Sequence, residues 1–580
     1  MKTLITVIIA LLAIIHVNAQ TSYYVDGANG NDSHSGTSLA QAWKTVQNAF
    51  DNATAGSTVY IKGGTYYENL NANVSGTAGN PITYRNYQND IVIIDGTGTA
   101  GTDMLYIEDQ SYIIIENITI QNMVAAYATG VTVSGTASGS VSNIALKNLK
   151  ISGINWTSNA SATPTSNDNS NPLLVSGEGT NQANAVKNIL IDSCEVFNNI
   201  TGFSESISLD GNVDSFIVSH NRVHDNLNIG ICMAGNYGVS SNATLDHARH
   251  GRCFLNTCYN NVSNYATSGG IYVDGGQNII IERNTSYGNG YGIEIGCEEN
   301  GSTSNIIVRD NVIYNNQQSG LAIGGYTSST TGQVLNTLVL NNTFLKNDYS
   351  NSGMGEVYMT KMSNSKIQNN IFYTNTQNIL ISKDNITPFS GNSINYNCWY
   401  TPNNDSNNIT VSWGNYNYTT FSNYVAQTGM DANSIFADPQ LTSNNVSSPD
   451  FHLLTRSLCI DKGDPAFTTA TNETDYFGGI RVVNSKVDIG ANEFPTPVAI
   501  NEIESDHSIV IFPNPARDHI NIETPVKAEL EIFNSEGQLV KIVQADNIHA
   551  SIDVSAFPCG IYVVKVRTEK GMEMKKFIKE

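Results

Sequence analysis

The sequence has few basic side chains for its length. Its 580 residues contain 29 Lys and Arg against 51 Asp and Glu, which gives a formal net charge of -22 at pH 7. Nucleic acid binding requires clustered Lys and Arg, so we expect no nucleic acid partner. The acidic surface also disfavours polyanions, unless a bound cation or a local cluster of Arg and His reverses the field.

Long apolar runs are scarce as well. Beyond the N-terminus, no apolar segment is long enough to cross a bilayer as a helix, so we expect no membrane span. At the N-terminus, Lys2 precedes a short apolar run, and a small-residue cleavage site ends at Ala19. This pattern predicts a secretory signal peptide over residues 1–19.

Cysteine is too thinly spread to define a disulfide framework or a zinc site. The chain has eight cysteines, with no CxxC pair, and no HExxH motif. Although an exported chain can form disulfides, cysteines at the apolar positions of a repeat are typical of buried free thiols, which we expect here. The cysteines are Cys194, Cys232, Cys253, Cys258, Cys297, Cys398, Cys459 and Cys559.

A short phrase recurs along the middle of the chain: two Asn five residues apart, then a Gly-Ile-x-Ile step. One copy begins at Asn284 and the next at Asn311. Such a unit cannot bury its apolar face alone and must stack on its neighbours. A unit of about 28 residues accommodates three short strands and three turns, which predicts an all-β, right-handed parallel β-helix with three faces. The Asn columns are explained by turns, because Asn tolerates the left-handed region and stacked amides can hydrogen-bond.

Other segments depart from the repeat. The spacing of Leu39, Trp43, Val46 and Phe50 predicts a helix, placed to cover the open first coil. The last segment contains short strands and is predicted to form a small antiparallel β-sandwich. The expected divisions are the signal peptide (1–19), the β-helix with its N-terminal cap (20–395), a C-terminal extension (396–495), a linker (496–507) and the sandwich (508–580).

Side chains that point outward from the Gly-Ile-x-Ile strands form an acidic and aromatic column. Successive coils place Asp210, then Tyr272 with Asp274, then Glu294 in this column, and Glu298 follows in the next turn. Coils stack about 4.8 Å apart. We therefore expect Asp274 and Glu294 to be neighbours, with Asp210 about two coils from Asp274.

A basic cluster lies in the longest turn of this region. Residues 246–252 contain two His and two Arg, and we expect this turn to emerge beside the acidic column and wall a groove. The alternative is a cap of salt bridges on the side of the solenoid. The four side chains are His247, Arg249, His250 and Arg252.

These groups suit a polysaccharide lyase. In such an enzyme, Arg or a bound cation neutralises a uronate carboxylate, and a base removes the proton at C5. The candidate bases are His250, Arg249 and Tyr272. Calcium, which prefers oxygen ligands, is a possible cofactor, and no organic cofactor is expected. Its expected ligands are Asp210, Asp274, Glu294 and Glu298.

The same carboxyl groups suit a glycoside hydrolase, in which the separation of two carboxyls sets the stereochemistry. Asp274 with Glu294 suits the short separation of a retaining enzyme, and Asp210 with Asp274 suits the longer separation of an inverting one. Further residues are expected to contact the substrate, the tyrosines by stacking on sugar rings: Tyr287, Tyr358, His247, Arg252 and Lys361.

Residues 508–580 carry the motifs of a known domain. FPNPA opens it at 512–516, IFNSEG follows at 532–537, GIYVVKV lies at 560–566, and KKFIKE ends it at 575–580. Together they resemble the C-terminal sorting domain of the type IX secretion system of Bacteroidetes. The resemblance implies export through the outer membrane, with the secretion machinery as a partner, and release or attachment at the cell surface.

Residues 20–495, with their repeats, capping helix and extension, resemble bacterial extracellular β-helix proteins of the pectate-lyase-like superfamily. That group includes pectate and alginate lyases and several glycosidases. The Asp-Asp pattern of polygalacturonases has no counterpart in this chain. Our leading prediction is a secreted, monomeric polysaccharide lyase that cleaves a uronic-acid polymer by β-elimination. The alternatives are a glycoside hydrolase and a non-catalytic surface adhesin or glycan-binding solenoid.

Overall fold

The computed structural model describes residues 21–495, except 327–328, and residues 509–580, except four short segments (525–526, 535–537, 546–548 and 569–570). The predicted signal peptide and linker lie outside the described residues. The chain divides into two compact units at Pro495. No helix in the described ranges is long and apolar enough to span a membrane.

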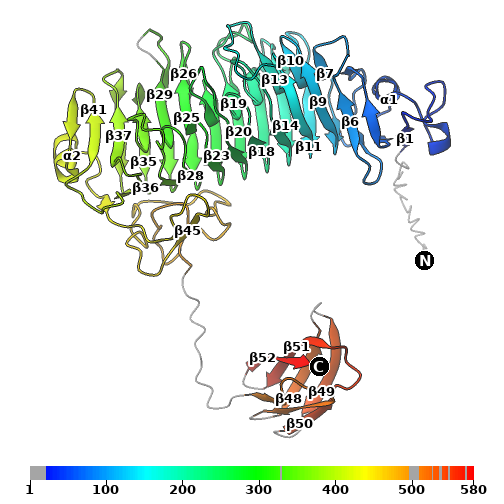
Figure 1. The fold of residues 1–580 in the computed structure, drawn as a ribbon, viewed down its shortest axis with the longest axis vertical. Helices are drawn as coiled ribbons and strands as arrows, with labels where there is room; N and C mark the ends of the chain where they lie inside the picture. The colour runs from blue at the N-terminus through cyan, green and yellow to red at the C-terminus, as the bar shows by residue number, and fades with distance from the viewer. Residues whose placement is uncertain are drawn as a thin grey trace, which may run out of the picture. The chain divides into compact units, whose positions relative to one another are not determined.

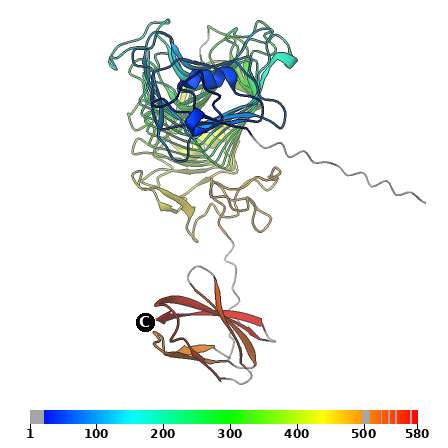
Figure 2. The ribbon, with the colours of Figure 1, turned by 90° about the vertical axis from the view of Figure 1, so that its right-hand side faces the viewer.

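The larger unit is a solenoid of three parallel sheets (Figure 1). One coil contributes β23 (Gln277–Glu282), β24 (Thr285–Tyr287) and β25 (Tyr291–Cys297), each to a different sheet. The sheets are called the long sheet (17 strands, with β23), the docking sheet (13 strands, with β24) and the site sheet (13 strands, with β25). The predicted three-faced parallel β-helix is confirmed, and Figure 2 shows its coils superposed when viewed from the end.

The solenoid extends past the boundary expected at residue 395. β40 (Cys398–Tyr400), β41 (Thr410–Trp413) and β43 (Ile435–Phe436) continue the docking and site sheets. The segment that leaves the solenoid is therefore 437–495.

A short helix covers the N-terminal end of the solenoid. α1 (Val46–Asn52) buries Val46, Ala49 and Phe50, and Phe50 stacks on Tyr84 with ring centroids 4.0 Å apart. The helix begins later than the sequence spacing suggested, because the Thr45 side chain caps it. Leu39 lies in a separate 3-10 turn and is exposed.

The first Asn column is a buried hydrogen-bonded ladder. Asn284 Nδ2 donates to Asn311 Oδ1 at 3.0 Å, and Asn311 Nδ2 donates to Asn342 Oδ1 at 2.8 Å. The stacked amides hydrogen-bond as predicted. Column members in the first coils, Asn117 and Asn148, are left-handed as expected, whereas the ladder residues from Asn284 onward are not. The left-handed position is the preceding residue, as at Arg283 and Asp310, both with φ 55°.

The second ladder ends on a carboxyl group. Asn316 Nδ2 donates to Asn347 Oδ1 at 2.8 Å. Asn347 then donates from its backbone N to Glu356 Oε1 at 2.9 Å and from Nδ2 to Glu356 Oε2 at 2.7 Å. Glu356 is 1% exposed, and burial raises its pKa to about 8.

Residues 437–495 pack on the outer face of the docking sheet. Side chains alternate along its strands, so Phe372 of β36 (Ile371–Tyr373) faces the solenoid core while Tyr373 faces outward. Tyr373 belongs to an apolar cluster that includes Phe451 of β45 (Asp450–Leu453).

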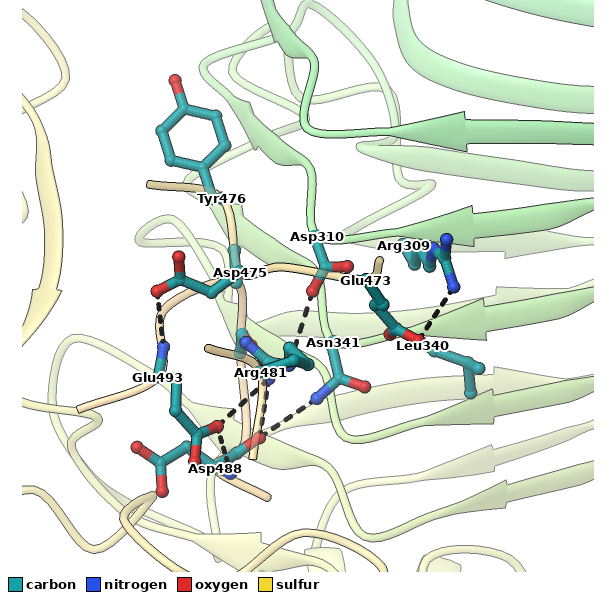
Figure 3. A network of polar contacts seen from close by, with 12 residues as sticks. Arg309, Asp310, Leu340, Asn341, Glu473, Asp475, Tyr476, Arg481, Asp488 and Glu493 are labelled. Carbon is teal, nitrogen blue, oxygen red and sulfur yellow. Dashed lines mark hydrogen bonds and ion pairs between the residues drawn. The ribbon is translucent and has the colours of Figure 1, made fainter. Parts of the chain in front are cut away.

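A buried ionic network joins the same segment to the solenoid, as Figure 3 shows. Arg481 is 0% exposed; its Nε lies 3.5 Å from Asp310 Oδ1, and its Nη2 lies 3.9 Å from Glu493 Oε2. Arg309 Nη1 lies 2.9 Å from Glu473 Oε2. These residues are called the docking cluster.

The smaller unit, over 509–580, consists of two antiparallel sheets of three and four strands. Its core is formed by residues of both sheets, such as Ile520 of β47 (His519–Glu523) and Ile532 of β48 (Ala528–Phe533). This arrangement confirms the predicted small β-sandwich.

The cysteines are free thiols, as expected. Seven of the eight are buried and Cys559 is exposed. They therefore fill core space without cross-linking the coils.

Candidate active site

The acidic column follows the site sheet, and strand register sets its order. Tyr272 aligns with Glu294, Glu294 with Ala322, and Ala322 with Tyr358. Asp274 aligns with Gly296, so Asp274 and Glu294 are diagonal rather than direct neighbours. The strands concerned are β16 (Ile207–Gly211), β19 (Ile231–Ala234), β22 (Gly269–Asp274), β25, β29 (Leu321–Gly325) and β33 (Val357–Met359).

A cavity of about 670 Å³ lies over the middle of this column. Among the described residues that line it, none is Lys, Arg or His. Its carboxyl groups belong to Glu205, Asp274, Glu294 and Glu298. Its aromatic lining consists of Phe203, Tyr237, Tyr265, Tyr272, Tyr291, Tyr326 and Tyr358.

Two donors hold the Asp274 carboxyl. The Tyr237 hydroxyl donates to Oδ2, and the Glu298 backbone N–H donates to Oδ1 at 2.9 Å. Asp274 is 3% exposed. Burial raises its pKa to about 7, and the Glu298 carboxyl acts in the same direction, while the two hydrogen bonds oppose the shift.

Glu294 and Glu298 share the cavity with Tyr272. The Tyr272 hydroxyl donates to Glu298 Oε1 at 3.2 Å. Burial raises the pKa of Glu294 well above its usual value, and the Glu298 and Asp274 carboxyls raise it further. Burial also raises the pKa of Glu298. A Cβ at Gly296 would lie 2.7 Å from the Tyr272 hydroxyl, so only glycine leaves room for this ring.

Glu205 is a cavity carboxyl that the sequence did not reveal. It lies in the turn before β16, where the alternation of strand side chains does not apply. Burial raises its pKa to about 8; the Ser208 hydroxyl lowers it, and the Asp210 and Asp274 carboxyls add to the rise. The only indication in the sequence was that Glu205 lies three residues before Ser208, at the start of a strand of the site sheet.

Asp210 lies two coils from Asp274, as predicted, with β19 between their strands. It is not among the residues that line the cavity. Burial raises its pKa to about 6; the Ser176 hydroxyl opposes the rise, and the Asp246 carboxyl adds to it. The pairing of Asp210 with Asp274 across one active site is therefore not supported.

The basic cluster is on another face, which corrects the expectation that it walls the groove. Arg249 and His250 lie on β20 (Ala248–Phe254), a strand of the long sheet. Both contact Asp214, at 3.2 Å from Arg249 Nε and 2.8 Å from His250 Nδ1. Arg252 of the same strand pairs with Glu282. These side chains form the salt-bridged cap that was the alternative.

The turn that leads to β20 does wall the cavity, through Tyr237. Asp246 holds this turn, because its carboxyl oxygens accept hydrogen bonds from two backbone N–H groups at 2.6 and 2.8 Å. His247 is buried, with Nδ1 3.0 Å from the Gly275 carbonyl oxygen. His247 therefore positions the turn and does not line the cavity.

The two predicted stacking tyrosines have different surroundings. Tyr358 lines the cavity, and its hydroxyl donates to Asp384 Oδ2 at 2.8 Å. Tyr287 lies on the docking sheet, stacked between Tyr259 and Tyr314 with centroids 5.0 and 4.8 Å away. Both faces of the Tyr287 ring are covered, so it offers no platform for a sugar.

Lys361 lies beside the cavity without lining it. It is 3% exposed, and its Nζ donates to the Thr330 carbonyl oxygen at 2.6 Å. Gly325, a lining residue, forms an isolated bridge with it. Burial lowers the Lys361 pKa.

The expected calcium ligands do not converge on one point. The described residues contain no group of three or more His, Cys, Asp or Glu placed to hold a metal ion. Both Asp274 oxygens already accept hydrogen bonds, and Asp210 is outside the cavity lining. This donor set does not fit calcium as arranged.

The smaller unit matches a known family. The family described as "Secretion system C-terminal sorting domain" matches residues 510–580. This match confirms the resemblance to the type IX sorting domain. The protein is thus exported by that system, to the cell surface or beyond it.

Three further proteins are similar to this chain over segments of different length. The solved structure of pectate lyase Pel9A is 15% identical, with a TM-score of 0.43, and the match covers 82% of this chain and 96% of that one. Pectate lyase PEL9 of Emericella nidulans is 43% identical over 76 residues, which are 13% of this chain and 18% of the relative. The Bacillus subtilis "Uncharacterized protein YwoF" is 36% identical over 446 residues, 74% of this chain and 90% of the relative. The chain therefore belongs to the family of YwoF.

Proposed function

We propose that this protein is an extracellular carbohydrate-active enzyme that hydrolyses glycosidic bonds. The observation that carries this proposal is the cavity on the site sheet, where four carboxyl groups meet aromatic side chains and none of the described lining residues is basic. A buried titratable group with a shifted pKa inside a cavity is a typical feature of catalytic sites.

The environments of Glu294 and Asp274 suit complementary roles. Burial holds the Glu294 pKa high and two neighbouring carboxyls raise it further, so Glu294 is suited to donate a proton to the glycosidic oxygen. Asp274 accepts two hydrogen bonds that favour its charged form. Asp274 is thus suited to act as the carboxylate that attacks the sugar or activates water.

The aromatic walls suit a sugar ring. Tyr358 lies three coils from Tyr272 on the same column, and Tyr291 stands at the start of β25 on the cavity wall. Aromatic faces contact the apolar C–H face of a pyranose, while their hydroxyls offer hydrogen bonds.

β-Elimination is a second candidate, supported by the 76-residue similarity to a pectate lyase. It requires a group that neutralises a uronate carboxylate. Arg249, Arg252 and His250 are on another sheet, so an added cation would have to supply that charge. A tyrosine hydroxyl such as that of Tyr272 would then be the base.

The test is to incubate the full-length protein with neutral, amino-sugar and uronic-acid polysaccharides in water enriched in oxygen-18. Hydrolysis inserts the heavy oxygen into the product, whereas elimination does not and instead creates an ultraviolet-absorbing double bond. We expect heavy oxygen in new reducing ends, and Glu294→Gln should abolish them. The matched control is Glu299→Gln, an exposed carboxyl outside the cavity lining.

Other outcomes would contradict this proposal. Unsaturated products, with or without added calcium, would establish the lyase. Tight glycan binding with no product of either kind would favour the non-catalytic solenoid.

A further inference from the structure

We propose that the sugar unit seated in this cavity carries an amino group, so that the substrate is an amino-sugar glycan rather than a uronate polymer. This inference rests on the proposed function, because it concerns the same cavity.

The floor of the cavity can accommodate one sugar ring. Ala322 lies between Glu294 and Tyr358 in the register of the site sheet, and the next outward position on its strand is Gly324. The methyl group of Ala322 leaves room above it, whereas Thr360 occupies the position beside Gly324 and borders the same cavity. Glu294 and Tyr358 are two coil spacings apart, about 10 Å, and therefore border a space of pyranose size.

The charges around that space are of one sign. Glu294 borders it directly, and Glu298 and Asp274 lie close enough to raise the Glu294 pKa. The whole chain carries a net charge of -22. A uronate would bring a further negative charge into a buried acidic site, which is unfavourable without a counterion.

An ammonium group supplies the missing partner. It has three donors and forms charge-assisted hydrogen bonds with carboxylates. Its arrival favours the ionised forms of Asp274 and Glu298, whose pKa values burial raises. At about pH 5, where the sugar amine already carries its proton, binding should therefore release protons to the buffer.

The experiment measures by calorimetry how three trisaccharides of similar size bind to the full-length protein. They are the trimers of glucosamine, of N-acetylglucosamine and of galacturonate. We expect glucosamine to bind about tenfold more tightly than the neutral sugar, and galacturonate to bind most weakly. Repeating the glucosamine titration in buffers of different ionisation enthalpy should show proton release. Mass spectrometry of the recovered sugars reports cleavage separately.

Three variants locate the effect. Glu298→Gln should remove most of the glucosamine preference, Glu294→Gln should keep it because Glu294 is the protonated acid, and Ala322→Trp should abolish binding of all three sugars by filling the floor. Glu178→Gln removes an exposed carboxyl outside the cavity lining; it is the control and should bind as the wild type does. Circular dichroism and the melting temperature confirm that each variant folds.

The results separate this inference from the proposed function. A glucosamine preference that depends on Glu298 supports the inference even if nothing is cleaved, in which case the hydrolase proposal fails. Cleavage of a neutral glycan without any preference for the amine would support hydrolysis and overturn the inference. Galacturonate binding that equals or exceeds glucosamine binding, with or without calcium, would also overturn it.

Discussion

The solenoid contains two groups of buried carboxyls with opposite surroundings. In the docking cluster, Asp310 and Glu493 face Arg481, and Glu473 faces Arg309. In the cavity, the carboxyls face one another and tyrosine hydroxyls, with no basic residue among the described lining residues.

The difference separates a structural role from a chemical one. A buried carboxylate with a guanidinium partner holds two segments in one arrangement, although its net effect on stability is small. Buried carboxyls without a cation destabilise the fold when ionised, and such groups are concentrated at functional sites. The contrast can be tested by removing members of each group.

The largest effect is expected from Arg481→Met. The change leaves Asp310 and Glu493 buried without their cation, so the larger unit should lose about 3–5 kcal/mol of unfolding free energy. Chemical denaturation measures this loss. The control is Lys150→Met, which removes an exposed pair with Glu195 at 3.3 Å and should change stability by less than about 1 kcal/mol. Equal losses in both variants would refute the structural role.

Glu294→Gln should lower the activity without lowering the stability, in contrast to Arg481→Met. Loss of the general acid should lower kcat by about 100-fold or more, while removal of a buried carboxyl from an acidic cavity should leave the unfolding free energy unchanged or higher. Steady-state kinetics and denaturation of the same preparation measure both. A variant that keeps its activity would remove Glu294 from the mechanism, whatever its stability.

The unfolding free energy should depend on pH because of the cavity carboxyls, which have no basic neighbour among the described lining residues. Glu205 has a folded pKa of about 8, above its unfolded value, so the folded state binds more protons than the unfolded state between these two values. Its contribution is complete below about pH 4 and is lost as the pH rises towards about 8. Glu205→Gln should therefore reduce the loss of stability between pH 5 and pH 8 by about 1–2 kcal/mol. An unchanged slope would mean that Glu205 is solvated.

The smallest effect is expected from Tyr237→Phe. Without the hydroxyl, Asp274 loses a donor that favours its ionised form, so its pKa should rise. The acidic limb of the pH–rate profile should shift to higher pH by a few tenths of a unit, with kcat reduced only a few-fold. A shift to lower pH would show that this hydrogen bond does not act on Asp274.

The periodic parts of the molecule were predictable from the sequence. The spacing of Asn284 and Asn311 gave the coil length, and strand alternation placed Tyr272, Asp274 and Glu294 on one face. Tyr358 reached the cavity by the same rule. Each of these predictions needs only the geometry of a repeated strand.

The cavity residues that were not predicted from the sequence lie in turns, and the repeat does not determine the course of a turn. Glu205 and Tyr237 enter the cavity from turns on either side of the strands. Arg249 and His250 were misplaced because the long turn ends before them, and a strand of the long sheet begins at Ala248. The direction in which a long turn returns depends on contacts such as those of Asp246, which are not visible in residue spacing.

The second Asn ladder has a direction, and this limits how such a protein can change in length. Each Asn side chain donates to the Asn side chain of the next coil. If a whole coil is added or removed in the middle of the ladder, the same amide–amide hydrogen bonds form again. The last member, Asn347, donates to a carboxyl group in place of a further amide oxygen, and the two oxygens of Glu356 accept from its backbone N and its Nδ2. A coil inserted on the N-terminal side of Glu356 would therefore extend this ladder, whereas Glu356 ends it although the coils that contain β36 and β40 continue the solenoid.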